Sequence, residues 1–303
     1  MKKTLIALAA VAATGAAFAQ SSVTLYGVAD VALTKQTGTS ASVMSAGSLN
    51  NGTSRWGVRG TEDLGGGLKA GFNFEQGLSL GDGSLSQAGA GEFGRAAWMN
   101  LAGGFGDLRL GRSLSPNFYG VAAWELTGTA NYSVVGSQFG ITGPARNSAQ
   151  IMYTTPNMGG FTVSFAHVLK GNNGDNGHNA LNAVYKNGPL AAGFAYAKTQ
   201  NAEDDNMSLG ASYSFGQFKI GGSFQDPAGD ARGFTLGGTV MAGPVSLTLD
   251  IARDTEFKDT NTLFEVKYPL SKRTFTYVAF VRDGEGKNAE ATNNLGLGIR
   301  HNF

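Results

Sequence analysis

The sequence has no cysteine, little proline and few charged side chains. Its 303 residues include no Cys and only 7 Pro, and Asp, Glu, Lys and Arg make up 15% of the chain, compared with about 25% in a typical soluble domain. The absence of cysteine excludes disulfides, thiol chemistry and Cys-based metal sites. The formal net charge of +1 argues against a nucleic-acid partner, because such partners select strongly basic surfaces.

Long apolar runs are missing beyond the N-terminus, so the sequence predicts no transmembrane helix. The N-terminus has a basic start, Met1–Lys3, an apolar run from Thr4 to about Gly15, and small residues at Ala17 and Ala19. This pattern predicts a cleaved secretory signal peptide at residues 1–19 and a mature chain of residues 20–303. An N-terminal anchor helix is the alternative, but the apolar run is short for a membrane span.

Glycine is abundant, with 46 residues, and most of the chain consists of short segments in which apolar and polar residues alternate. In residues 245–251, for example, Val, Leu, Leu and Ile alternate with Ser, Thr and Asp. A period of two residues predicts strands with one apolar and one polar face. About sixteen such strands are expected, at residues 22–35, 54–62, 67–76, 93–102, 107–113, 147–156, 160–169, 179–187, 190–199, 206–215, 218–226, 232–242, 245–254, 261–270, 273–283 and 293–303.

Alternation alone fits both a soluble β-sandwich and a membrane barrel, but three further features favour the barrel. Strand patterns continue to the last residue. Short turns such as 188–189 and 243–244 alternate with longer polar links such as 36–53 and 284–292. Aromatic residues lie near strand ends, where an interfacial girdle would place them: Tyr26, Trp56, Tyr153, Tyr185, Tyr213 and Tyr268. The sequence therefore predicts an all-β, antiparallel transmembrane barrel, and about sixteen strands are enough to enclose an aqueous channel.

One link, residues 114–145, is long and lacks the two-residue period. It contains Phe118, Tyr119, Trp124 and Phe139, so it is too apolar for a disordered loop. We expect this segment to fold into the barrel lumen and narrow it. An exposed extracellular loop is the alternative.

Several stretches resemble the Gram-negative general porins of the betaproteobacterial type. They occur in the order of that family, and are Ser22–Asp30, Ser54–Leu68, Phe93–Arg95, Phe105–Arg112, Arg146–Tyr153 and the terminal Phe303. The resemblance implies a homotrimer of 16-stranded barrels in the outer membrane, with the third loop inside each barrel. It also implies that an arginine cluster on the wall, matching Arg55, Arg95 and Arg146, faces that loop. Phe303 matches the aromatic end that the barrel-insertion machinery recognises.

The positions of charged residues support part of this site. Arg55 and Arg59 alternate with Trp56 and with Val58, so both arginines are expected to face the lumen. Arg95 shares parity with lipid-facing residues, so its place in the pore would need a bulge or a rim position. Glu125 is the one charged side chain in residues 114–145 and would supply the acidic side of the constriction. We therefore expect Arg55, Arg59, Arg95, Arg146 and Glu125 to form the constriction and to give a weak preference for anions.

The sequence contains little that could support catalysis. There is no G-x-S-x-G, P-loop or zinc-type motif. The three histidines, His167, His178 and His301, fall at strand ends or in a loop, and the acidic run 203–205 is more typical of a solvated loop than of a Ca²⁺ site. The sequence predicts no enzyme activity, no cofactor and no metal.

The expected function is passive diffusion of small hydrophilic solutes and ions across the outer membrane. Its expected partners are outer-membrane lipid, two further copies of the chain and the insertion machinery. Three alternatives remain open: a substrate-specific channel of the same fold for organic anions or sugars, a barrel lipid hydrolase that would use His167, and a periplasmic β-sandwich adhesin or binding module.

Overall fold

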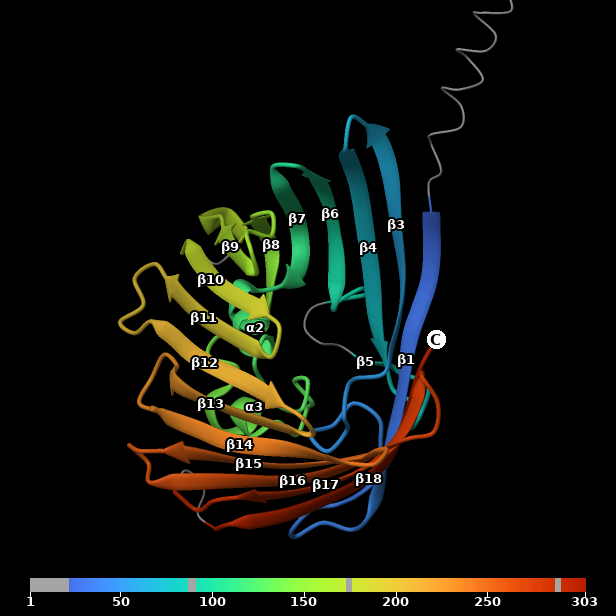
Figure 1. The fold of residues 1–303 in the computed structure, drawn as a ribbon, viewed down its shortest axis with the longest axis vertical. Helices are drawn as coiled ribbons and strands as arrows, with labels where there is room; N and C mark the ends of the chain where they lie inside the picture. Colours follow the sequence, from blue (N-terminus) through green and yellow to red (C-terminus); the bar gives the residue numbers. More distant parts are fainter. Residues whose placement is uncertain (1–21, 87–90, 173–175, 287–289) are drawn as a thin grey trace, which may run out of the picture.

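The computed structural model describes residues 22–86, 91–172, 176–286 and 290–303, so the predicted signal peptide lies outside the described residues. Sixteen long strands form one closed antiparallel sheet, in which β1 pairs with both β18 and β3 (Figure 1). The first eight long strands are β1 (Ser22–Lys35), β3 (Arg55–Gly65), β4 (Leu68–Leu78), β6 (Ala96–Gly103), β7 (Gly106–Leu114), β8 (Arg146–Thr154), β9 (Phe161–Val168) and β10 (His178–Asn187). The other eight are β11 (Leu190–Thr199), β12 (Asn206–Phe215), β13 (Phe218–Asp226), β14 (Gly233–Ala242), β15 (Val245–Asp254), β16 (Asp259–Pro269), β17 (Thr274–Asp283) and β18 (Thr292–Asn302). Short elements are β2 (Ser42–Met44), β5 (Leu85–Ser86) and the 3-10 turn η1 (Lys170–Asn172).

The predicted fold class, an all-β barrel of about sixteen strands, is confirmed. Most strand boundaries agree within three residues of the expected ones. The segment expected to start at residue 93 begins only at Ala96, because Phe93 has a left-handed φ of 52° and interrupts the extended chain.

The two faces of the sheet have inverted polarity relative to a soluble protein. Leu209, Leu236 and Leu297 lie on the outer face and are 57%, 66% and 54% exposed. On the inner face, Ser208 and Thr235 are buried. An outer face of this kind needs an apolar solvent, as in a membrane barrel, and argues against the soluble β-sandwich. Among the helices of the described residues, none has the length and apolarity needed to cross a membrane.

Most of the expected aromatic girdle lies on the outer surface. Trp56, Tyr153, Tyr213 and Tyr268 are all exposed, in positions that suit the membrane interfaces. The prediction is wrong for Tyr26, whose hydroxyl donates to the side chains of Asn73 and Glu75 on the inner face of β4. Tyr185 is half-buried and packs on Phe161, with 4.4 Å between the ring centroids.

The long segment between β7 and β8, residues 115–145, contains two short helices, α2 (Pro116–Ala122) and α3 (Val134–Phe139). Ser115 caps α2 by accepting a hydrogen bond from the Phe118 N–H, and α3 ends at Gly140, which has a φ of 65°. The helix α2 packs on β9–β12 and α3 packs on β15 and β16 (Figure 1). The segment is thus anchored along one half of the wall.

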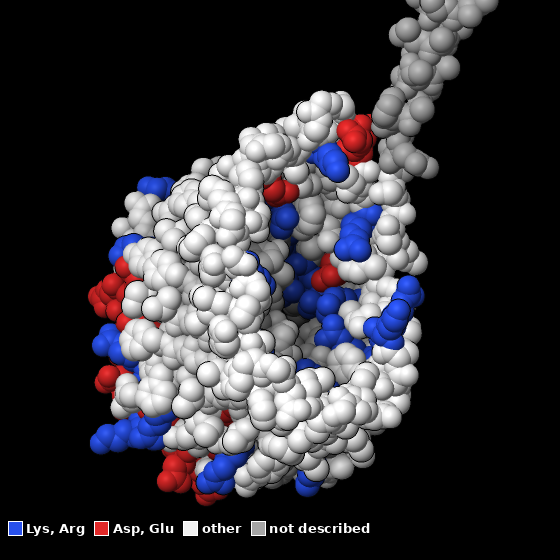
Figure 2. Space-filling model, in the orientation of Figure 1, with Lys and Arg blue, Asp and Glu red and all other residues white. Residues whose placement is uncertain are grey.

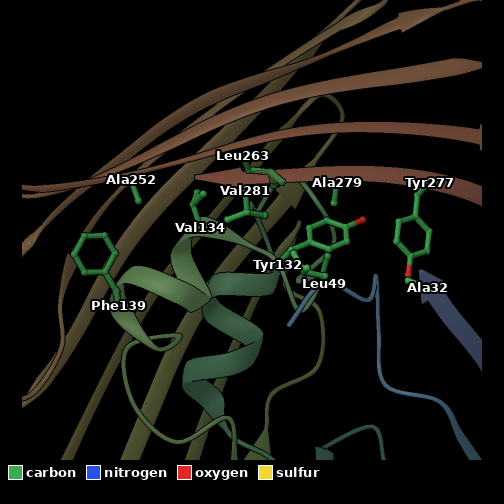
Figure 3. Close-up of a cluster of buried hydrophobic side chains, with 11 residues drawn as sticks. Ala32, Leu49, Tyr132, Val134, Phe139, Ala252, Leu263, Tyr277, Ala279 and Val281 are labelled. Atoms are coloured by element: carbon green, nitrogen blue, oxygen red, sulfur yellow. The ribbon is translucent and has the colours of Figure 1, made fainter. Parts of the chain in front are cut away.

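Small residues on the wall allow this close packing. A Cβ atom at Gly193 would lie 2.1 Å from the Gly120 carbonyl oxygen of α2, and one at Gly210 would lie 2.3 Å from the ring of Trp124. At α3, Tyr132, Val134 and Phe139 lie against the wall in a cluster with Ala252, Leu263, Tyr277, Ala279 and Val281 (Figure 3). Apolar burial therefore holds both helices of the segment against the wall.

Candidate functional site

A polar cavity of about 440 Å³ lies between the 115–145 segment and the half of the barrel wall that α2 and α3 do not contact. Figure 2 shows a hollow in the molecule with Lys and Arg side chains on its walls. The charged side chains that line the cavity are Arg55, Glu75, Arg95, Arg109, Arg146 and Arg300. The neutral side chains include Asn73, Trp98, Phe118, Tyr119, Thr129 and Asn131. Five arginines therefore face one carboxylate.

The structure brings together the three arginines that the resemblance indicated. Glu75 links two of them, since its carboxylate lies 3.4 Å from Nε of Arg55 and 2.7 Å from Nε of Arg95. Nε of Arg146 donates to the Arg95 carbonyl at 2.9 Å. Because a guanidinium stays protonated at physiological pH, the cluster carries a permanent positive charge.

The structure explains how Arg95 reaches the cavity although it shares parity with lipid-facing residues. Arg95 precedes β6 and is not part of the alternating strand, and its backbone N–H donates to the Glu75 carbonyl. The left-handed Phe93 just before it turns the chain at this point. Arg95 is therefore free of the strand's alternation and its side chain reaches Glu75.

Two further arginines of the cavity were not among the predicted site residues. Arg109 lies over the ring of Trp98, with 4.2 Å from Cζ to the centroid. Arg300 donates from Nη1 to the Asn51 side chain at 2.8 Å. The sequence does indicate that Arg109 faces inward, because it alternates with the outward Leu108 and Leu110. Parity alone, however, could not show that β7 and β18 line the same cavity.

Arg59 does not join this cluster. It lies four residues after Arg55 on β3, its side chain is exposed, and its guanidinium is 5.0 Å from the ring of Tyr26. The structure thus places it on the wall outside the cavity.

Glu125 also differs from its expected role. Its side chain is buried and accepts hydrogen bonds from Thr127 N at 2.9 Å, Thr127 Oγ1 at 2.7 Å, Thr129 N at 2.6 Å and Ser133 Oγ at 2.8 Å. These donors all belong to the same segment. Glu125 therefore organises the turn between α2 and α3 and does not line the cavity, where the acidic group is Glu75.

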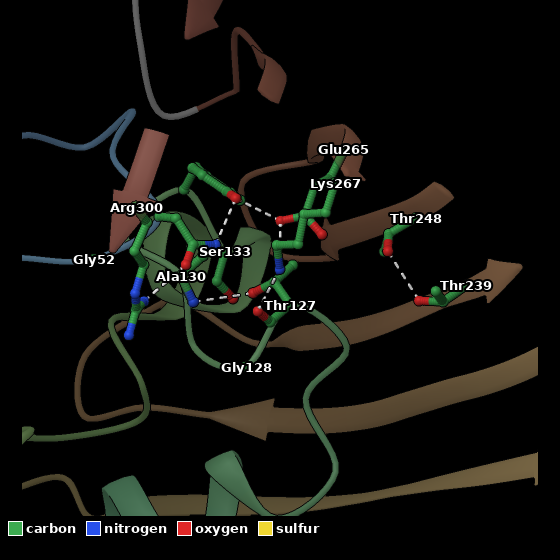
Figure 4. Close-up of polar contacts among 12 residues, drawn as sticks. Gly52, Thr127, Gly128, Ala130, Ser133, Thr239, Thr248, Glu265, Lys267 and Arg300 are labelled. Carbon is green, nitrogen blue, oxygen red and sulfur yellow. Dashed lines mark hydrogen bonds and ion pairs between the residues drawn. The ribbon is translucent and has the colours of Figure 1, made fainter. Parts of the chain in front are cut away.

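Polar contacts fix the 115–145 segment on the wall. Lys267 forms an ion pair with Glu265 at 3.0 Å and donates to the Thr127 carbonyl at 3.0 Å (Figure 4). The Tyr132 hydroxyl donates to Glu265 at 2.5 Å. Burial, followed by the charge of Glu265, raises the pKa of Tyr132, so this hydroxyl stays neutral and remains a donor.

The remaining predicted residue, Phe303, closes the barrel. Its backbone N–H and carbonyl both pair with Gly27 at 3.1 Å, and its ring occupies the space beside Gly27 that a Cβ atom would need. The ring is 49% exposed on the outer surface. In the described parts of the chain, no three His, Asp or Glu side chains gather in an arrangement that could hold a metal ion.

Comparisons with known proteins agree with this geometry. The sequence model of the Gram-negative porin family matches residues 4–289. The chain is 33% identical to outer membrane porin protein 32 of Delftia acidovorans and 30% identical to major outer membrane protein P.IB of Neisseria meningitidis, with full coverage of both proteins in each case. Among solved structures, an anion-selective porin from Comamonas acidovorans superposes with a TM-score of 0.76 at 28% identity, covering 94% of this chain and 100% of that one. The chain therefore belongs to the Gram-negative porin family, as an outer-membrane β-barrel channel protein and not an enzyme.

Proposed function

We propose that this chain forms a homotrimeric diffusion channel for small hydrophilic solutes that favours anions, and that the 115–145 segment constricts it. The observation that carries the proposal is the excess of five arginines over one glutamate around a single cavity. Fixed charge of one sign in a narrow, partly desolvated passage raises the local concentration of the opposite ion. The anion-selective character named for the Comamonas acidovorans porin supports the same choice.

The test is the reversal potential of the refolded protein in a planar bilayer with a salt gradient. We expect an anion permeability about two- to tenfold above that of the cation. The arginines give the cavity a strong positive field, but the water in the cavity weakens it. Replacing Arg55 and Arg146 with Gln leaves three cavity arginines and Glu75, so it should lower the ratio toward one, while keeping the 2.7 Å pair of Arg95 and Glu75. Arg59→Gln is the matched control, since it removes an arginine of the same strand outside the cavity. Cation preference of the unmodified channel would refute the proposal.

The proposed trimer follows from the resemblance to general porins. Single-channel recordings should show closures in three equal steps, and cross-linking in detergent should yield a trimer band. Monomers alone in both measurements would remove this part of the proposal.

We also propose that Phe303 is the assembly signal in cells. Phe303→Ala keeps both backbone bonds to Gly27, so refolding into lipid vesicles should be little changed. In cells, the amount of folded barrel in the outer membrane should fall several-fold, and Phe303→Tyr should restore it. Equal amounts for Phe303→Ala and the unmodified chain would show that the ring carries no such signal.

A further inference from the structure

The face of α2 that lies toward the arginine cavity is aromatic. On this helix Pro116, Asn117, Gly120 and Val121 are buried, while the side chains of the adjacent pair Phe118 and Tyr119 are only half-buried and line the cavity.

The two rings of α2 form an edge-to-face pair with 6.1 Å between the centroids of Phe118 and Tyr119. From the opposite side, Trp98 of β6 adds a third ring to the lining. Neighbouring apolar surfaces with a polar rim are typical of ligand-binding grooves.

The segment offers no charge to this cavity. Its one acidic side chain, Glu125, is buried and accepts four hydrogen bonds from the segment itself. The segment residues that line the cavity are neutral, among them Gly128, Thr129 and Asn131 beside the two rings. The arginine wall therefore faces an aromatic and neutral surface instead of an acidic one.

Arg146 and Arg300 are the guanidinium groups best placed to hold an anion. Arg55 and Arg95 share Glu75, and Arg109 has the Asp107 carboxylate at 3.7 Å. Within the described residues, neither Arg146 nor Arg300 has a carboxylate within 4.0 Å. A guanidinium without such a partner can bind a carboxylate through two parallel hydrogen bonds.

Arg109 connects the two kinds of surface. Its guanidinium lies on Trp98, and its Nη1 is 3.4 Å from the Tyr119 hydroxyl. Aromatic rings and guanidinium groups thus line one space of about 440 Å³, which is within the range of about 300–1,000 Å³ typical of small-molecule sites.

From this arrangement we infer that the cavity is selective for small aromatic carboxylates over aliphatic ones of equal charge and size. The carboxylate would bind at Arg146 or at Arg300, and the flat apolar ring would stack against Phe118 and Tyr119. Chloride uses only the charged half of the site and an uncharged sugar only the aromatic half. The inference rests on the proposed anion channel and specifies its substrate class.

The experiment compares block of the chloride current by benzoate and by cyclohexanecarboxylate in a planar bilayer. Both carry one negative charge on a six-membered ring, but only benzoate has a π face. We expect half-block of the current at a benzoate concentration about three- to tenfold lower, the effect of one or two ring contacts. In the double variant Phe118→Leu and Tyr119→Leu the two acids should block equally, because leucine keeps apolar bulk without a ring. Trp56→Leu, which removes an outward-facing ring, should leave the difference unchanged.

The outcomes separate this inference from the proposed function. Anion preference in the salt gradient together with equal block by the two acids would overturn the inference and leave the anion channel intact. Absence of anion preference would remove both. Since the comparison of acids is made on the unmodified chain, a folding defect in the double variant does not affect it.

Discussion

Leu249→Arg is expected to destabilise the inserted barrel by about 2–4 kcal/mol, the cost of an arginine on the lipid face near the bilayer midplane. Leu249 is 51% exposed and lies in the middle of β15, at Val245–Asp254. Its neighbours on the outer face are apolar, so the guanidinium would find no partner there. Urea titration of folding into lipid vesicles, followed by the mobility shift of the folded barrel on gels, measures the loss.

The matched control for Leu249→Arg is Val245→Arg. Val245 has the same parity on the same strand but begins it, next to the Gly243–Pro244 turn. Near the interface the same substitution should cost only about 0–1 kcal/mol. Equal losses at the two positions would show that the outer face of β15 does not contact a lipid core.

Gly193→Ala is expected to displace α2 from the wall and to lower the single-channel conductance. The new Cβ would lie 2.1 Å from the Gly120 oxygen and 3.0 Å from its carbonyl carbon, and both are backbone atoms of α2. The helix must therefore move away from β11, toward the cavity on its other side. Overpacking of this kind costs about 1–3 kcal/mol, which folding titrations should detect alongside the conductance.

A glycine without close neighbours gives the control for Gly193→Ala. Gly104 has no atom within 4 Å of its added Cβ, so Gly104→Ala should change neither conductance nor stability appreciably. Unchanged conductance in Gly193→Ala would mean that the position of α2 does not limit the current.

The barrel could be predicted from the sequence because a two-residue period is a local property of each strand. It located Arg55 on the inner face and gave the correct number of long strands. It was insufficient at Arg95, which precedes its strand, and at Tyr26, whose position near a strand end suggested the interface while its parity pointed inward.

The interior of the 115–145 segment was less accessible to such reasoning. Composition showed that it is apolar and contains one acidic residue, Glu125. The partners of that residue, Thr127, Thr129 and Ser133, depend on how a nonperiodic chain turns back on itself. The gathering of Arg109 with Arg300 likewise depends on barrel closure, which joins strands far apart in sequence.

Two different arcs of the barrel wall support the 115–145 segment and carry the arginines of the cavity. Strands β9–β12, β15 and β16 supply the contacts of α2 and α3, whereas the arginines of the cavity come from β3, β7, β8, β18 and the residue before β6. Where substitutions on the two arcs share no partner, their free energies should add. The arginines that line the cavity can then be altered over evolution, or by an engineer, while the support of the 115–145 segment stays unchanged.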